Sequence, residues 1–155
     1  MTETVNLQDL DPRFKDEVAA EPGCQHLPRC FSCGVCTATC PVSELTPGFS
    51  PSQIIRQVFY GQREALLSSS ALWHCVRCAR CSFQCPQDVR FLDVIQGLRN
   101  LAIRDGRVSP ARVARLEQGE RLIAELRQRL IGELLAGDEA SEAADALKRL
   151  MNDVD

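Results

Sequence analysis

Eight cysteines dominate the chemistry that this sequence can perform, and they stand in two runs of identical spacing. The first run holds Cys30, Cys33, Cys36 and Cys40, followed by Pro41, and the second holds Cys75, Cys78, Cys81 and Cys85, followed by Pro86. Both runs obey C-x2-C-x2-C-x3-C-P, and every cysteine of the second lies 45 residues after its counterpart. Chains bind [4Fe-4S] clusters with this spacing. The two runs therefore predict two [4Fe-4S] clusters as cofactors.

The spacing suits a cluster for a geometric reason. Gaps of two residues let one loop present three thiolates to three corners, whereas the fourth cysteine points away from that loop. The proline after it fixes its own φ and favours an extended preceding residue, so the backbone does not fold back over the cluster. Structural zinc is disfavoured because four-cysteine zinc sites use two pairs separated by a longer loop. Disulfides are disfavoured because such tight loops separate the Cα atoms poorly for bridging.

The runs resemble those of bacterial-type ferredoxins, in which the fourth cysteine of each run binds the other cluster. This resemblance implies a crossed arrangement that ties the two halves of the domain together. Cluster one would be held by Cys30, Cys33, Cys36 and Cys85, and cluster two by Cys75, Cys78, Cys81 and Cys40. The ninth cysteine, Cys24, has no counterpart in the second half, and we interpret it as a buried thiol that binds no iron. His26 and His74 are interpreted as hydrogen-bond donors beside the clusters or as surface residues.

The composition is that of one ordinary soluble domain with extensions. The chain has 155 residues, of which 45% are hydrophobic and 25% charged. No stretch approaches the ~20 apolar residues of a membrane-spanning helix, and the N-terminus lacks the basic and apolar regions of a signal peptide. We therefore expect a cytoplasmic protein without direct membrane insertion, since a reducing compartment keeps cysteines free to bind metal.

The net charge of −3 is distributed unevenly along the chain. Residues 1–23 carry −4, residues 24–108 carry +4 and residues 109–155 carry −3. A basic middle segment suits a domain whose thiolates and clusters add negative charge to its interior. Nucleic-acid binding is not predicted, because the basic residues form no run and aromatic residues are few. Arg77 and Arg80 stand between cysteines of the second run only, so we expect cluster two to have the higher reduction potential.

The segments between and after the runs have helical rather than strand periodicity. Ser50 and Pro51 are typical of a helix start, and the helix they begin is expected to end at Gly61. A short helix is predicted at 63–67 and a longer one at 91–104, where an apolar stripe recurs. The members of that stripe are Phe91, Val94, Ile95, Leu98, Leu101 and Ala102. The predicted fold class is all-α, with a helical ferredoxin-like dicluster domain at 24–108.

Two extensions flank this domain. Residues 1–23 form an acidic N-terminal arm in which 12–20 has room for about two helical turns; it either lies on the domain or a partner, or is partly disordered. Residues 109–155 form a C-terminal helical extension, with a long amphipathic helix at 110–136 and a weaker one at 139–151. Packing of the long helix on the protein's own core and docking of a partner both remain open.

Residues beyond the cysteines extend the resemblance. Leu72 and Trp73 before the second run, and the residues of 93–102 after it, resemble the C subunit of heterodisulfide reductase and its bacterial relatives over about residues 28–108. The resemblance to helical dicluster domains of succinate dehydrogenase and of anaerobic glycerol-3-phosphate dehydrogenase is more distant. The resemblance to the C subunit of heterodisulfide reductase implies that this chain is an electron-transfer subunit of a hetero-oligomer. Its clusters would relay electrons between a flavin- and cluster-bearing A subunit and a catalytic, cysteine-rich B subunit.

The sequence excludes several other roles. It contains no adjacent cysteines, so it lacks the motif of the catalytic B subunit, and it has no GxGxxG or P-loop nucleotide motif. A cluster that binds substrate at an open iron needs a missing ligand, and both runs are complete. We therefore predict no catalytic residues, and a non-catalytic electron-transfer subunit. The alternative is the iron–sulfur subunit of a membrane quinone-linked oxidoreductase.

Overall fold

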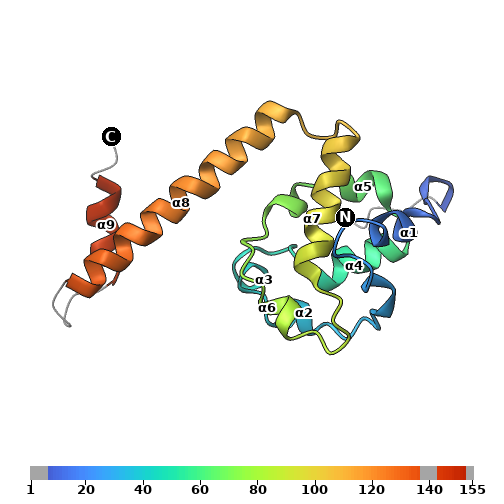
Figure 1. Cartoon of the computed structure of the whole chain (residues 1–155), viewed down its shortest axis with the longest axis horizontal. Helices are drawn as coiled ribbons and strands as arrows, with labels where there is room; N and C mark the ends of the chain where they lie inside the picture. Colours follow the sequence, from blue (N-terminus) through green and yellow to red (C-terminus); the bar gives the residue numbers. More distant parts are fainter. Residues whose placement is uncertain (1–6, 137–142, 153–155) are drawn as a thin grey trace. The chain divides into compact units, whose positions relative to one another are not determined.

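The computed structural model describes residues 7–136 and 143–152. Every regular element within those residues is helical, which confirms the all-α prediction. The chain divides into two compact units, Met1–Val108 and Ser109–Asp155 (Figure 1).

The first unit is built from short helices around one longer helix. Helices α4 (Pro51–Phe59), α5 (Arg63–Leu67) and α7 (Phe91–Arg104) confirm the predicted helices. The sequence did not predict α2 (Val35–Ala38), α3 (Pro41–Leu45) and α6 (Arg80–Phe83), which are four or five residues long and lie within or directly after the cysteine runs. The remaining elements are α1 (Phe14–Ala19) and the 3-10 helices η1 (Leu7–Asp9), η2 (Leu27–Arg29) and η3 (Ser70–Trp73).

Helix α7 is the centre of this unit. It packs against α1, α5, α6 and η3, and in Figure 1 it passes through the middle of the globular part. The predicted apolar stripe is confirmed, since all of its members are buried. Burial of a large aliphatic or aromatic side chain contributes about 1.5–3 kcal/mol, so this stripe is the main attachment for the shorter helices.

The N-terminal segment shares that core. Phe14 and Val18 of α1 are fully buried, and α1 packs against α4, η2 and α7. The backbone N–H of Asp11 donates to the carbonyl of Gly61 at 2.8 Å. Gly61 has a φ of +71°, and a Cβ there would lie 2.3 Å from the Asp11 carbonyl oxygen. The described part of residues 1–23 therefore lies on the domain, in agreement with the first of the two interpretations above.

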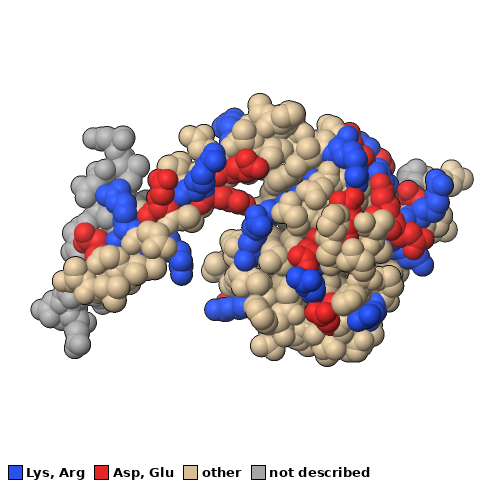
Figure 2. Space-filling view, in the orientation of Figure 1, with Lys and Arg blue, Asp and Glu red and all other residues tan. Residues whose placement is uncertain are grey.

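Ion pairs fasten α1 and α5 to the end of α7. Arg63 Nε lies 2.8 Å from Glu17 Oε2, and Arg63 Nη1 lies 2.6 Å from Asp105 Oδ2. The hydrogen bond from Arg63 lowers the pKa of Asp105 below its ordinary value. Basic and acidic side chains are accordingly interspersed on the face that Figure 2 shows, rather than separated by sign.

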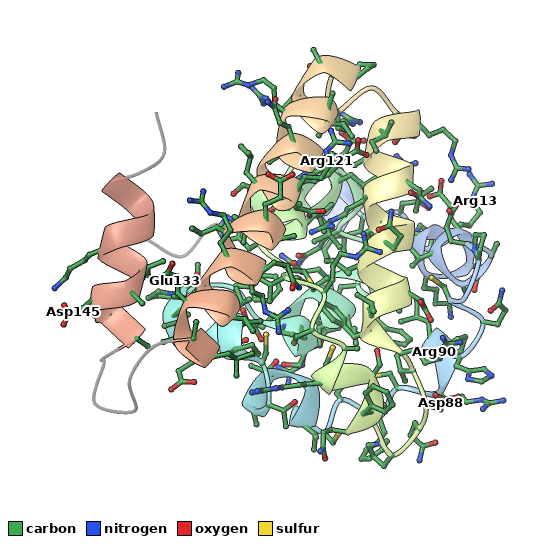
Figure 3. The ribbon with its side chains drawn as sticks, turned by 60° about the vertical axis from the view of Figure 1, so that its left-hand side comes forward. Arg13, Asp88, Arg90, Arg121, Glu133 and Asp145 are labelled. Carbon is green, nitrogen blue, oxygen red and sulfur yellow. The ribbon has the colours of Figure 1, made fainter. Side chains whose placement is uncertain are left out.

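The second unit consists of α8 (Pro110–Ala136) and α9 (Ala143–Asn152), which pack against each other. The predicted long helix is confirmed, and the weaker helix is observed from residue 143, its predicted start lying outside the described residues. No residue of α8 is buried, and Arg121, Glu133 and Asp145 of this unit are labelled in Figure 3. Among the described helices, none combines the length and apolar character needed to cross a lipid bilayer.

Candidate iron-sulfur sites

The two cysteine runs have the same local backbone structure. Just before the second cysteine of each run, Ser32 and Arg77 are left-handed, with φ of 59° and 56°. Just after it, Gly34 and Ala79 are also left-handed, with φ of 82° and 61°, and each begins a four-residue helix, α2 or α6. Left-handed conformations cost free energy for residues other than glycine. Their recurrence at matched positions indicates that the same requirement shapes both loops, namely to turn three thiols towards one side.

Each run borders a small cavity, and each cavity also receives a cysteine from the other run. The empty space at the first cavity is about 370 Å³ and at the second about 320 Å³, including in both cases space that is open to solvent. The first is lined by Cys30, Cys33, Cys36 and Cys85, together with Cys81, and the second by Cys40, Cys75, Cys78 and Cys81. All eight cysteines of the runs thus lie at one of two cavities, in groups that contain the four members of each crossed set.

The two cavities share a wall. Cys81 and Phe91 line both of them, and both side chains are buried, with 8% and 2% of their surface exposed. Phe91 is the first residue of α7. Groups bound in the two cavities would therefore be near neighbours separated by protein side chains rather than by solvent.

The beginnings of α4 and α7 close the cavities. Ser52 of α4 and Phe91 of α7 line the first cavity, and Pro51 and Leu92 line the second. A helix N-terminus carries a partial positive charge from its aligned peptide dipoles. Both cavities therefore have an electrostatic environment that favours an anionic group such as a thiolate-bound cluster.

Backbone donors reach the cysteine sulfurs. The N–H of Ser32 donates to Cys30 Sγ and the N–H of Val89 to Cys85 Sγ, both at 3.4 Å. Such donors stabilise the negative charge of thiolates bound to iron. The first cavity is lined by five cysteines and the second by four, Cys81 being common to both. These thiols, the N–H donors to sulfur and the helix N-termini fit the binding of a [4Fe-4S] cluster. Among the described residues, no group of three or more His, Cys, Asp or Glu side chains is placed to hold a single metal ion.

The buried thiols resist ionisation without metal. Burial raises the pKa of Cys36 and Cys75 and raises that of Cys81 to about 11. At Cys75 the backbone N–H of Arg77 and the charge of Arg99 oppose that rise in pKa. Coordination to iron deprotonates a thiol, so binding of a cluster at these positions would release protons.

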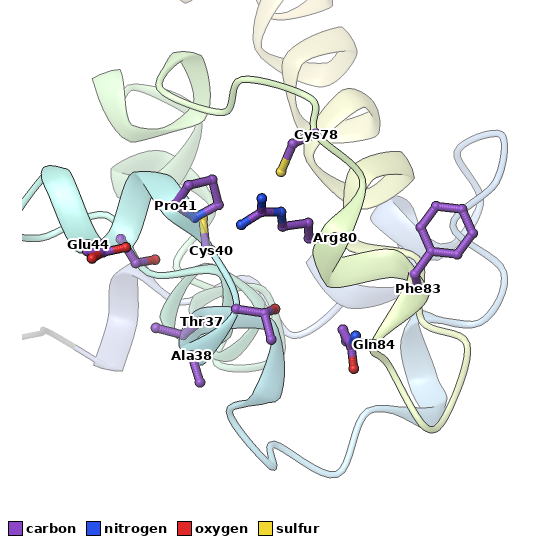
Figure 4. A pocket seen from close by; sticks show the side chains of 11 residues that line it. Thr37, Ala38, Cys40, Pro41, Glu44, Cys78, Arg80, Phe83 and Gln84 are labelled. Carbon is purple, nitrogen blue, oxygen red and sulfur yellow. The ribbon is translucent and has the colours of Figure 1, made fainter. Parts of the chain in front are cut away.

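The second cysteine of each run is exposed, whereas the other six are partly or fully buried. Cys33 and Cys78 are these matched exposed residues, and each follows closely on an exposed apolar residue, Phe31 or Val76. Figure 4 shows a surface hollow beside the second cavity, with Cys40, Cys78 and the guanidinium of Arg80 around it. The sites are therefore most accessible from outside the protein at Cys33 and Cys78.

Cys24 lies apart from both cavities. Its side chain is fully buried and its Sγ donates to the carbonyl of Asp93 at 3.3 Å. Burial, followed by the nearby Asp93 and Glu21 carboxylates, raises the pKa of this thiol to about 11. It does not line either cavity, so the structure agrees with its interpretation as a buried thiol.

The two histidines lie at the edges of the cysteine runs. His26 Nδ1 lies 3.0 Å from Asp88 Oδ2, and the His74 ring stacks on Phe49 with centroids 6.4 Å apart. Asp88 and Arg90, which belong to the turn into α7 and both have positive φ, lie at the same end of the first unit in Figure 3.

Sequence reasoning missed Arg99. This arginine is 5% exposed and donates through Nε to the carbonyl of Leu72 at 2.8 Å and through Nη2 to that of Cys75 at 3.2 Å. Its guanidinium also lies 5.3 Å from the centre of the Trp73 ring. The available signal was periodicity, because Arg99 follows Phe91 and Ile95 at steps of four residues and so occupies the buried face of α7.

Comparisons with known proteins agree with this arrangement. Residues 29–90 match the family of 4Fe-4S dicluster domains. The C subunit of the H2:CoB–CoM heterodisulfide,ferredoxin reductase of Methanothermobacter thermautotrophicus is 37% identical over 106 residues, which are 68% of this chain and 56% of the relative. The iron–sulfur C subunit of the CoB–CoM heterodisulfide reductase of Methanopyrus kandleri is 31% identical over an alignment of 114 positions that covers 69% of this chain and 59% of the relative.

A third relative covers less of the chain at higher identity. The C subunit of the ferredoxin/F420H2-dependent CoB–CoM heterodisulfide reductase of Methanosarcina acetivorans is 40% identical over 81 residues, which are 52% of this chain and 49% of the relative. The chain thus spans only about half to three fifths of the length of these relatives. The family model matches the segment that carries both cysteine runs. Residues 29–90 are therefore identified as a [4Fe-4S] dicluster domain, and the chain is homologous to the C subunits of heterodisulfide reductases.

Proposed function

We propose that this chain is a non-catalytic electron-transfer subunit that holds two [4Fe-4S] clusters in series. The observation that carries the proposal is the composition of the two cavities. Each is lined by the first three cysteines of one run and the fourth cysteine of the other, and the first cavity is also lined by Cys81, which it shares with the second. Complete cysteine ligation leaves a cluster only outer-sphere electron transfer. The homology to the C subunits of heterodisulfide reductases supports the same conclusion.

In this proposal each of the eight cysteines in the two runs binds one of the two clusters. Cluster one is held by Cys30, Cys33, Cys36 and Cys85, and cluster two by Cys75, Cys78, Cys81 and Cys40. Bound in these cavities, the clusters supply one-electron transfer. The residues of this chain hold them side by side, exclude water with Phe91 and the ends of α4 and α7, and expose one edge of each site at Cys33 and Cys78.

The partners of the proposal are a flavin- and cluster-bearing A-type subunit and a catalytic, cysteine-rich B-type subunit. The chain would relay electrons between them within a heterodisulfide-reductase-like complex. The exposed edges at Cys33 and Cys78 provide two separate points of approach, one for each site. The names of the relatives favour this role over an iron–sulfur subunit of a membrane quinone-linked oxidoreductase.

The first test is anaerobic purification of the chain from its native cell with iron analysis. We expect about eight irons per chain, copurification of a flavoprotein and of a subunit with adjacent cysteines, and two magnetically coupled reduced clusters by EPR spectroscopy. Stoichiometric zinc with no iron, or about four irons with every cysteine intact, would contradict the proposal.

The crossed ligation has its own test in four matched serine variants. Cys33→Ser and Cys78→Ser each alter the EPR spectrum of one cluster and so mark which is which. If ligation is crossed, Cys85→Ser alters the spectrum of the cluster that Cys33→Ser marks, and Cys40→Ser that of the cluster that Cys78→Ser marks. The opposite pairing would show that each run binds its own cluster. Cys24→Ser is the control, and it should leave both spectra unchanged.

A further inference from the structure

Arg99 brings a positive charge into the interior of the protein beside one of the two sites. Its Nη2 donates to the carbonyl of Cys75, whose own sulfur lines the second cavity, and its Nε donates to the carbonyl of Leu72. Of the lysine and arginine side chains in the described part of the chain, Arg99 is the one that is buried. A buried charge is rare because removing it from water is costly, so its place beside a single site requires an explanation.

In the first half of the domain, the carbonyl that corresponds to that of Leu72 has a different hydrogen-bond donor. Leu27 matches Leu72 in the 45-residue repeat, and both side chains are fully buried. The carbonyl of Leu27 accepts the N–H of Cys30 at 3.1 Å, a bond within its own turn. The carbonyl of Leu72 instead accepts from the guanidinium of Arg99, held over Trp73. The two sites thus share a backbone plan and differ in the cation beside Cys75.

Burial makes this charge more effective than the arginines inside the second run. Arg77 and Arg80 are exposed, so water and salt weaken their influence on charges at the cavity. Arg99 acts through a medium of lower effective dielectric constant, and salt screens it much less. A nearby positive charge stabilises the reduced, more negative form of a cluster.

We propose that Arg99 raises the reduction potential of cluster two above that of cluster one, so that a single electron on this chain resides at the Cys75 site. The inference rests on the proposed function, since it requires a cluster in each cavity. The step is a one-electron reduction in which no bond forms or breaks. The electron comes from the flavoprotein partner in the complex and from dithionite in a titration.

The first test uses the unaltered chain with both clusters bound. EPR-monitored redox titrations are run at low salt and at about 1 M KCl, where the Debye length falls to about 3 Å. The Cys33→Ser and Cys78→Ser spectra assign each midpoint potential to a site. We expect cluster two to have the higher potential and to keep most of that difference at high salt. A difference that disappears in salt assigns it to exposed Arg77 and Arg80 and overturns the proposal, as does a higher potential at cluster one.

The second test separates charge from packing in three variants. Arg99→Gln removes the charge, and Arg99→Lys keeps a positive charge without the planar guanidinium. Arg77→Ser combined with Arg80→Val removes the two exposed arginines and is the matched control. We expect Arg99→Gln to make the potential of cluster two more negative and to leave cluster one unchanged. Arg99→Lys should keep the reduction potential of cluster two close to that of the unaltered chain. The control should shift that potential less than Arg99→Gln does.

Iron content distinguishes a failure of the proposed function from a failure of the proposed role of Arg99. If the unaltered chain does not carry two clusters, the proposed function fails. If it carries both, and Arg99→Gln keeps its iron without moving the potential of cluster two, only the role of Arg99 is refuted. An Arg99→Lys variant whose potential falls as far as that of Arg99→Gln would also refute it, because it would show that hydrogen-bond geometry rather than charge sets the potential. If Arg99→Gln does not fold, the salt titration of the unaltered chain decides the question.

Discussion

Thr37 and Ser82, which stand 45 residues apart, each accept a hydrogen bond from the second residue of a longer helix. The N–H of Ser52 in α4 donates to Thr37 Oγ1 at 2.9 Å, and the N–H of Leu92 in α7 donates to Ser82 Oγ at 3.3 Å. Thr37 directly follows Cys36, and Ser82 directly follows Cys81. The same bond therefore attaches the beginning of a helix to the third cysteine of each run.

Removing either hydroxyl should loosen the attached site. We expect Thr37→Val and Ser82→Ala each to lower the free energy of unfolding by about 1–2 kcal/mol, because a helix N–H loses its partner. Each variant should also release iron faster to a chelator. Thr39→Val is the control, since Thr39 directly follows α2 and its hydroxyl donates back to the carbonyl of Val35 in that same helix. Equal chelator rates in all three variants would contradict this account.

The second prediction concerns the left-handed backbone at Ser32 and Arg77. Glycine adopts this conformation freely, whereas a β-branched residue is strained there. We expect Ser32→Gly and Arg77→Gly to keep full iron content and thermal stability. Ser32→Val and Arg77→Val should each lose about 1–2 kcal/mol relative to the glycine variants. Thermal unfolding of the cluster-loaded proteins measures the difference. Valine variants as stable as the glycine variants would show that the loops relax on substitution.

Cys24 should be dispensable for cluster binding. Cys24→Ala is expected to keep the iron content of the unaltered chain, whereas Cys36→Ala should lose a cluster. Because the Cys24 thiol is fully buried and its pKa is raised to about 11, it should resist iodoacetamide at pH 8 in the folded protein and react after denaturation. Mass spectrometry of the tryptic peptide gives the extent of modification. Loss of iron in Cys24→Ala would place this residue among the ligands.

Gly61 and Gly106 provide a matched test of how the N-terminal segment is held. Both have positive φ, +71° and +69°, but a Cβ at Gly61 would collide with the Asp11 carbonyl while one at Gly106 would meet nothing within 4 Å. We expect Gly106→Ala to cost about 1–2 kcal/mol from its conformation alone. Gly61→Ala should cost more and should expose residues 7–20 to proteolysis. Equal stability and equal proteolysis in the two variants would argue against the Asp11 contact.

The fold was largely predictable where a pattern repeats over several turns. Apolar periodicity located α7 and α8, and Ser50 with Pro51 located the start of α4, because these signals lie within one element. The short helices α2 and α6 were not predictable, since four residues carry no periodic signal. Their positions follow from left-handed residues that the sequence marks as glycine in one run only, at Gly34 and not at Ala79.

The sequence by itself indicated a [4Fe-4S] cofactor, because the spacing of the eight cysteines within each run is the spacing that binds such clusters. Only the tertiary structure decided which cysteines face a common cavity, that Cys81 and Phe91 stand between the two, and that Arg99 is buried beside Cys75. Those relationships join residues far apart in the chain. They depend on how helices pack around α7, and local spacing along the chain carries no information about that packing.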